Sequence, residues 1–182
     1  MYEKVEYIWD PPRPSADRSD LTFTSVHTGE QRAVFEQAVY AVLDGSLDRA
    51  DQAALRAGDR KAHAERLSRP DGGFRYETHW WSLAYDPDGN IVGIVQPVVF
   101  VSADRDGHPE GTIHYVGVLP AFRGRGYISD LLAKGTNVLA HLGVWRIYAD
   151  SDVRNAPMRQ AFLRLGYREG RVRSVPLPDT AP

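Results

Sequence analysis

Residues 119–132 read LPAFRGRGYISDLL, in which two glycines and two arginines alternate directly before an amphipathic run. Glycine lets a backbone come close to a ligand, and the first N–H groups of a helix have no partner inside the helix. Arginine adds hydrogen bonds to phosphate or carboxylate oxygens. The segment therefore indicates either an anion site at a helix N-terminus or a plain turn that needs glycine for its dihedral angles.

Residues 152–167 carry a second motif, which falls at the start of another predicted helix. It reads D-x-x-N-x-P-M and ends in a leucine–glycine–tyrosine triplet; its residues are Asp152, Asn155, Pro157, Met158, Phe162, Leu165, Gly166 and Tyr167. Together with the glycine-rich segment, this motif resembles the GNAT superfamily of CoA-dependent N-acetyltransferases. The likeness covers residues 80–167, which are expected to form an acyl-CoA-binding core.

The family's acyl-CoA loop reads arginine or glutamine, two variable residues, glycine, one variable residue, then glycine or alanine. Arg123 and Gly126 match its first two fixed positions, whereas Ile128 stands where a small residue is usual. We expect the Ile128 side chain to turn into the core with Leu131 and Leu132, which lie on the same helical face. The backbone N–H of Ile128 then remains free for a ligand.

The resemblance implies that this loop holds the pyrophosphate of acetyl-CoA, the acyl donor, and that the helix dipole adds roughly half a positive charge. It also implies an oxyanion site at the Val118 amide, a contact of Asn155 with the cofactor arm, and packing of Phe162 against the sulfur. The expected cofactor-binding residues are Val118, Arg123, Gly124, Arg125, Gly126, Tyr127, Ile128, Asn155 and Phe162. Asn155 also suits a helix N-cap, and each arginine also suits a solvated surface.

The chain contains no cysteine, which excludes an acyl-cysteine intermediate, so direct transfer to an amine in a ternary complex is expected. Family members often place a glutamate base on the strand before the loop, but the corresponding residue here is Thr112. Glu110 and His114 share its face by strand alternation, and each is a candidate base, directly or through water. Phe162 replaces the family's tyrosine acid. The candidates for that role are water, Tyr115, Tyr127 and Ser129.

Two other functions compete with acetyl transfer. The absence of the usual catalytic groups at Thr112 and Phe162 favours a non-catalytic acyl-CoA-binding or sensory module of the same fold. GRGYIS also resembles the dinucleotide fingerprint G-x-G-x-x-G, with Ser129 at the last glycine and Asp150 as the ribose-binding acid. In that fingerprint the first glycine follows the strand directly, whereas residues 120–123 intervene here. An NAD-binding protein is therefore the remote alternative.

The composition limits the partners and the location of the protein. A length of 182 residues suits one domain, which we expect to span residues 1–182. A formal net charge of -2 and a sequence pI of about 6.3 disfavour nucleic acid and anionic membranes as partners. No run approaches roughly 18 apolar residues, no secretory signal opens the chain, and the histidines lack metal-ligand spacing. We expect a cytoplasmic protein without a metal that acts on an amine of a small molecule or peptide. The resemblance also implies that a homodimer can form.

Hydrophobic periodicity predicts the elements that position these residues. Helices are expected at 30–43, at 47–67 with a break near Gly58, at 126–142 and at 155–165. Strands are expected at 5–9, 21–27, 80–85, 91–101, 112–119, 146–149 and 172–177, and Pro97 predicts a bulge or a gap in pairing. This order indicates a mixed α/β domain. The resemblance implies a mostly antiparallel, twisted sheet flanked by helices and splayed where strands 112–119 and 146–149 run parallel. Helices within residues 20–75 are expected on the acceptor side.

Overall fold

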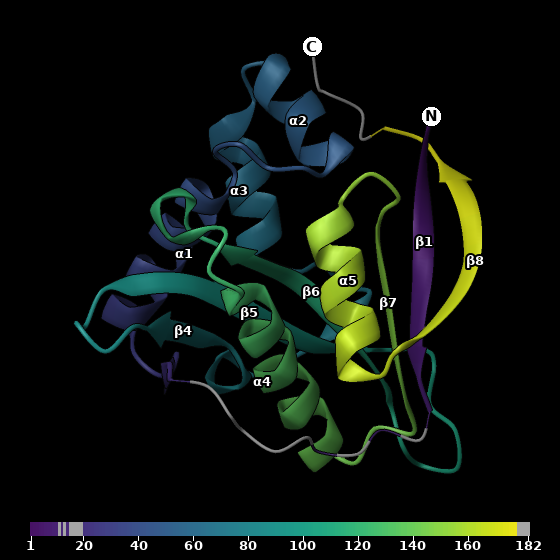
Figure 1. Ribbon diagram of the computed structural model, residues 1–182. Helices are drawn as coiled ribbons and strands as arrows, with labels where there is room; N and C mark the ends of the chain where they lie inside the picture. The colour runs from purple at the N-terminus through teal and green to yellow at the C-terminus, as the bar shows by residue number, and fades with distance from the viewer. Residues whose placement is uncertain (11, 13, 15–19, 178–182) are drawn as a thin grey trace.

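The computed structural model describes residues 1–10, 12, 14 and 20–177. Eight strands in this part of the chain form one sheet in the order β2, β4, β5, β6, β7, β1 and β8, with β3 paired to β5 (Figure 1). Their bounds are β1 Tyr2–Trp9, β2 Thr22–Ser25, β3 Phe74–Arg75, β4 Ser82–Tyr85, β5 Ile91–Phe100, β6 Glu110–Val118, β7 Arg146–Asp152 and β8 Arg168–Val175. All neighbouring strands are antiparallel except β6 and β7, which confirms the expected mixed α/β fold.

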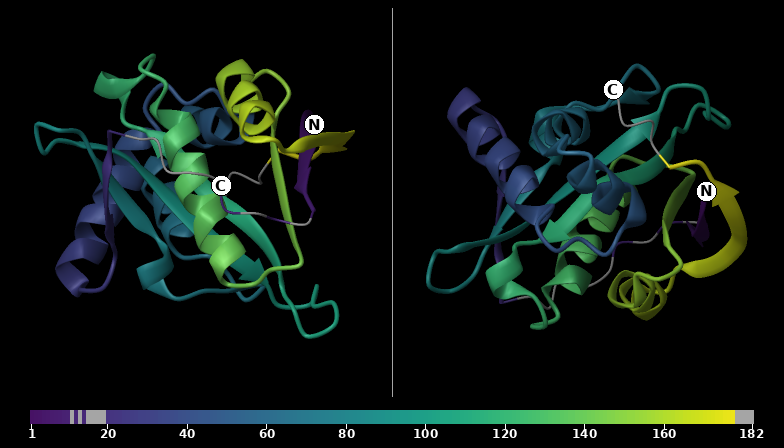
Figure 2. Two further views of the ribbon diagram at one scale, coloured as in Figure 1. Left: turned by 60° about the horizontal axis from the view of Figure 1, so that its bottom comes forward. Right: turned by 90° about the horizontal axis from the view of Figure 1, so that it is seen from above.

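Two groups of helices cover the two faces of the sheet. The helices are α1 Gly29–Val42, α2 Arg49–Arg56, α3 Arg60–Ser68, α4 Tyr127–His141 and α5 Ala156–Leu165. Figure 2 shows α1, α2 and α3 on one face and α4 and α5 on the other. Gly58, with φ of +77°, separates α2 from α3, so the expected break is confirmed. No helix in the described ranges is long and apolar enough to cross a membrane.

Local sequence explains where the helices begin and end. Thr28 and Gln31 form a capping box at the start of α1, which satisfies two backbone N–H groups that lack helical partners. Asn155 caps α5 by accepting a hydrogen bond from the Met158 amide at 3.3 Å. Gly166 ends α5 in the left-handed conformation, with φ of +102°, which glycine adopts without strain from a side chain.

The parallel strands β6 and β7 separate soon after they meet. Only two residue pairs join them, Glu110 with Arg146 and Gly111 with Ile147. Both strands continue well beyond this point, so the later part of β6 has no β7 neighbour on that edge. This confirms the splay expected for the parallel pair.

A β-bulge lies in β6 opposite Pro97. Gln96 pairs with Tyr115 and Pro97 pairs with Ile113, so His114 is the additional residue. Proline has no N–H to give to the ladder, which accounts for the irregularity at this position and confirms the sequence expectation. The alternation of β6 side chains reverses here. Before the bulge Ile113 packs toward α4, and after it Tyr115 packs with the core beneath α1.

Strand β1 occupies a position that the sequence pattern did not reveal. It lies between β7 and β8 and is antiparallel to both. Its Val5 and Tyr7 side chains are fully buried, and the Tyr7 ring stacks on Phe162 at 4.5 Å between centroids. The N-terminal strand therefore completes the core beneath α5. The Pro-rich connector that follows falls largely outside the described residues.

Candidate active site

One cavity of about 890 Å³ opens where β6 and β7 separate. The connection from α1 to α2, strand β6, the glycine loop of residues 123–126 and the start of α5 form its walls. The cavity lining includes every expected cofactor-binding residue except Arg125. These residues are Val118, Arg123, Gly124, Gly126, Tyr127, Ile128, Asn155 and Phe162. The fold thus brings together residues that come from two separate sequence motifs.

The glycine loop presents open backbone at the start of α4. Gly124 and Gly126 have φ of +79° and +86°, a region that residues with a Cβ rarely adopt. Apart from the chain neighbours, an added Cβ at either position would meet no heavy atom of the described residues within 4 Å, so this side of the glycines is open. Gly126 is the N-cap of α4, and it makes no side-chain capping bond. Ile128 packs against the core clusters that contain Leu131 and Leu132, as expected.

Arg123 uses its guanidinium group to bind backbone carbonyls rather than leaving it free in the cavity. Nε donates to the Val118 carbonyl at 3.1 Å, one terminal nitrogen donates to Val42 at 2.8 Å, and the other donates to Gly45 at 3.1 Å. Val42 ends α1, where carbonyl groups lack helical partners and the dipole favours a cation. Arg123 therefore ties the glycine loop to α1, and three of its five N–H groups are engaged in this way.

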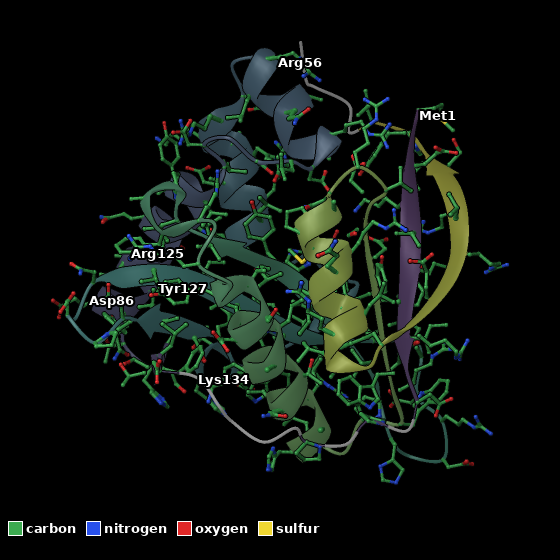
Figure 3. All side chains as sticks on the ribbon, viewed as in Figure 1. Met1, Arg56, Asp86, Arg125, Tyr127 and Lys134 are labelled. Carbon is green, nitrogen blue, oxygen red and sulfur yellow. The ribbon has the colours of Figure 1, made fainter. Side chains whose placement is uncertain are left out.

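Arg125 lies outside the cavity lining. Its guanidinium group stacks over the Phe122 ring at 5.3 Å from the centroid. Figure 3 shows Arg125 and Tyr127 at the N-terminal end of α4, on the side of Asp86. Burial acts to raise the pKa of Asp86, but hydrogen bonds from Asn90 and Asp88 and the charge of Arg125 hold this pKa below its ordinary value. Arg125 is thus placed on the rim of the glycine loop.

The amide of Val118 faces the gap between the splayed strands. The neighbouring Leu119 amide donates to the Val92 carbonyl of β5 at 2.8 Å. Because consecutive N–H groups of a strand point to opposite edges, the Val118 amide points toward β7. Pairing with β7 has already ended at Gly111. The Val118 N–H is therefore a hydrogen-bond donor on the open edge of β6, and it lies a few residues before the glycine loop.

Asn155 and Phe162 close the α5 side of the cavity. Asn155 caps its helix through its side-chain oxygen, and the residue also lines the cavity. Phe162 is only 2% exposed and packs between Tyr7 and Tyr167, at 4.5 Å and 5.0 Å between ring centroids. Phe162 therefore supplies an apolar wall.

Glu110 and His114, the two candidate bases, have different surroundings. Glu110 is buried outside the cavity lining, and Arg146 holds its carboxylate with Nε at 2.6 Å. His114 lines the cavity, and its Nε2 is buried without a hydrogen bond to the described residues. Burial lowers the pKa of His114 to about 4, against raising effects from Asp71 and the Leu67 backbone. The ring is neutral at pH 7 and is a weak proton acceptor.

A hydrogen-bonded cluster around Asp51 lies in the same cavity and was missed from the sequence. Asp51 accepts hydrogen bonds from Ser46 at 2.6 Å and Tyr115 at 3.2 Å, and its other oxygen lies 2.8 Å from His63 Nε2. All four residues line the cavity. Burial, followed by the Asp51 charge, raises the pKa of Tyr115 well above its ordinary value. Asp51 and His63 are buried on two different helices, and the sequence carries no local signal for either.

Charged residues of β1, β7 and β8 complete the rim. Lys4 binds Asp150 at 2.8 Å and lies 4.0 Å from Asp48, and Arg173 also binds Asp150. Nearby, Arg49 binds the fully buried Asp152 through two nitrogens, at 2.7 and 2.9 Å, and so fastens α2 to β7. Among the described residues, no group of three acidic, histidine or cysteine side chains is arranged to hold a metal ion.

This fold, with its splayed parallel pair and its glycine loop at a helix N-terminus, is that of the GNAT acetyltransferases. Residues 48–167 match the model of the acetyltransferase (GNAT) family, so the chain belongs to that family. No match to the chain was found among curated proteins.

Solved structures of the same fold include a GCN5-related N-acetyltransferase from Sphaerobacter thermophilus. It has 18% identity and a TM-score of 0.54, with 93% of this chain and 49% of that one covered. A GNAT-family acetyltransferase from Colwellia psychrerythraea has 14% identity and a TM-score of 0.59, with 93% and 53% covered. The chain thus spans about half the length of these two proteins. AAC(6')-Iy in complex with a CoA bisubstrate analog has 18% identity and a TM-score of 0.55, with 86% and 96% covered.

Proposed function

We propose that this protein transfers the acetyl group of acetyl-CoA directly to an amine of a small molecule or peptide. The observation that carries this proposal is the open edge of β6. Its Val118 amide faces the gap left by β7, and the uncovered glycine loop begins a few residues later. An extended thioester arm can pair with such an edge as an added strand would, while its phosphates reach the start of α4.

Different cavity residues suit the pyrophosphate and the thioester of acetyl-CoA. The backbone of residues 124–128 can offer N–H groups and the positive end of the α4 dipole to the pyrophosphate. The Val118 amide can donate to the thioester carbonyl oxygen as negative charge develops there. In the reaction the amine nitrogen bonds to the carbonyl carbon, the carbon–sulfur bond breaks and CoA leaves as a thiolate. The ammonium form of the amine first gives one proton to a base, and after attack the nitrogen loses a second proton, which converts the thiolate to the thiol.

Loss of the usual acid and base does not by itself stop this reaction. A thiolate is a tolerable leaving group because its conjugate thiol has a pKa of about 8.5. Phe162 cannot protonate it, and lost acid catalysis is typically worth about 10² to 10⁴ in rate. We therefore expect turnover that depends chiefly on positioning and on the Val118 amide.

Titration calorimetry with acetyl-CoA, CoA and NAD, paired with a CoA-release assay over a panel of amines, tests the proposal. We expect binding of acetyl-CoA and CoA without binding of NAD, and release of CoA that requires an amine. Binding of acetyl-CoA with no amine-dependent release would favour the non-catalytic acyl-CoA-binding module. Binding of NAD in place of CoA would overturn both functions.

A further inference from the structure

One wall of the cavity is built from aromatic rings. His114 contacts Phe74 edge-on at 5.1 Å between centroids, Phe74 contacts Phe100 at 5.3 Å, and Phe100 lies 6.5 Å from Tyr148. The four rings come from β6, β3, β5 and β7, and all of them line the cavity. Each remains partly exposed, unlike the fully buried rings of the core. A continuous, part-exposed aromatic wall in a cavity is suited to hold an apolar, planar group.

Among the described residues, three carboxylates line this cavity, those of Asp48, Asp51 and Asp150. Asp51 differs from the other two in the charges around it. Lys4 lies close to both Asp48 and Asp150, and Arg173 binds Asp150 as well. The only ion-pair partner of Asp51 in the described chain is His63, and its other contacts are neutral hydroxyl groups. Asp51 is therefore the carboxylate whose negative charge is least compensated by lysine or arginine.

Asp51 also has room for one more donor. An ionised carboxylate accepts about four hydrogen bonds, and three are made by Ser46, Tyr115 and His63. The Asp51 carboxylate can therefore accept one further hydrogen bond from an ammonium group in the cavity.

The carboxylate and the aromatic wall are neighbours. His63 and Leu67 are four residues apart on α3, and residues at this spacing lie about 5–6 Å apart on one helix face. Asp51 holds His63, and His114 lies beside the Leu67 backbone at the start of the wall. Tyr115, which also contacts Asp51, follows His114 directly in the bulge. A short linker can therefore join a group bound at Asp51 to a ring on the wall.

From this arrangement we infer that the acceptor is a primary amine carried on an aromatic body. Asp51 binds its ammonium group, and the wall of Phe74, Phe100, His114 and Tyr148 holds its ring. The inference rests on the proposed function and adds the class of acceptor. The ammonium loses one proton to the Asp51 carboxylate before attack, and the nitrogen loses a second to the departing thiolate after attack.

Three probes test the two halves of the inference: 2-phenylethylamine, n-hexylamine and 2-phenylethanol. CoA release gives kcat/KM for the amines, and calorimetry gives binding of all three. For the wild type we expect 2-phenylethylamine to exceed n-hexylamine in kcat/KM by about tenfold, a difference that stacked aromatic contacts can supply. 2-Phenylethanol, which lacks the ammonium group, should bind weakly. A preference for n-hexylamine would overturn the aromatic half.

Asp51→Asn keeps the shape of the side chain and removes its charge. We expect kcat/KM for 2-phenylethylamine to fall on the order of 10²-fold, with binding of 2-phenylethanol and of acetyl-CoA unchanged and the unfolding midpoint lowered, because asparagine cannot accept all three hydrogen bonds. Asp48→Asn is the matched control; Asn still caps α2, and Lys4 already offsets Asp48, so a much smaller loss is expected. Wild-type rates in Asp51→Asn, or an equal loss of acetyl-CoA binding, would overturn the role of Asp51.

Calorimetric binding of the amine distinguishes a failure of the amine site from a failure of acetyl transfer. If the wild type releases no CoA with any amine, the proposed acetyl transfer fails. Binding of 2-phenylethylamine that Asp51→Asn abolishes would still support the amine site. Binding that Asp51→Asn leaves unchanged would overturn that site, whatever the turnover.

Discussion

Gly126 shows most directly how one residue type serves the site. Its φ of +86° and the open space around it suit a backbone that approaches phosphates. Gly126→Val should lower the affinity for CoA at least about tenfold, because a β-branched side chain disfavours this dihedral angle and covers the α4 amides. Calorimetry measures the affinity. Gly89→Val is the matched control, because Gly89 has φ of +81° and open surroundings in the β4–β5 turn, away from the cavity. Equal loss in both variants would contradict the phosphate cradle.

His114 gives a prediction on pH. Its pKa is lowered from 6.5 in the unfolded chain to about 4 in the fold, chiefly by burial. The unfolded state therefore binds more protons between these values, and stability falls as pH falls through this window. The loss attributable to His114 is about 3 kcal/mol at most. Urea unfolding at neutral and acid pH should show that acidification lowers the unfolding free energy of His114→Asn less than that of the wild type. His108→Asn, at an exposed histidine, should behave as the wild type, and an unchanged acid loss in His114→Asn would contradict the assignment.

Residue patterns in the sequence predicted which residues form the glycine-loop side of the cavity, but they did not predict the cluster around Asp51. Gly124, Gly126 and Asn155 fall in continuous motifs whose local geometry follows from glycine dihedrals and helix caps. Asp51 and His63 stand on two different helices, and only tertiary packing against Tyr115 brings them together. Nothing in their local sequence distinguishes them from solvated helix residues.

At the scale of elements, Arg123 connects the glycine loop to α1. Arg123→Ala removes bonds to three carbonyls and should lower the unfolding free energy by roughly 1–3 kcal/mol, since hydrogen bonds from a charged donor are worth this much. CoA affinity should fall with it as the loop loosens. Arg125→Ala is the comparison two residues away. It removes a surface stack on Phe122 and should change stability little. Urea unfolding distinguishes the two, and a larger loss in Arg125→Ala would contradict this account.

Hydrophobic periodicity predicted most helices and strands, but it did not predict how the strands pair with one another. The helices on either side of Gly58 and the bulge opposite Pro97 were predicted because glycine and proline act through their own backbones. The short strand β3, and the reversal of side-chain direction at His114, depend on pairing with β5. Register is a property of two strands, so one strand's pattern does not reveal it.

At the scale of the whole molecule, β1 near the N-terminus pairs with β8 near the C-terminal end of the described chain. Its place between β7 and β8 buries Tyr7 against Phe162, which lines the cavity. Tyr7→Ala should lower the unfolding free energy by about 3–5 kcal/mol, as for other buried aromatic side chains. Tyr7→Phe keeps the stacked ring and should lose far less. Equal stability of Tyr7→Ala and wild type in urea unfolding would show that β1 is dispensable. The sequence predicted a strand here but not its partners, because strand order depends on contacts between distant segments.

The central claim is that the gap between β6 and β7 is where an acetyl group passes from acetyl-CoA to an amine. The most direct test incubates the protein with acetyl-CoA and 2-phenylethylamine and follows free CoA together with the mass of the amine. We predict CoA release matched one for one by acetylated amine, strongly reduced in Gly126→Val and unchanged in Gly89→Val. Acetyl-CoA that binds in this gap without any acetylated amine, across the full amine panel, would contradict the claim.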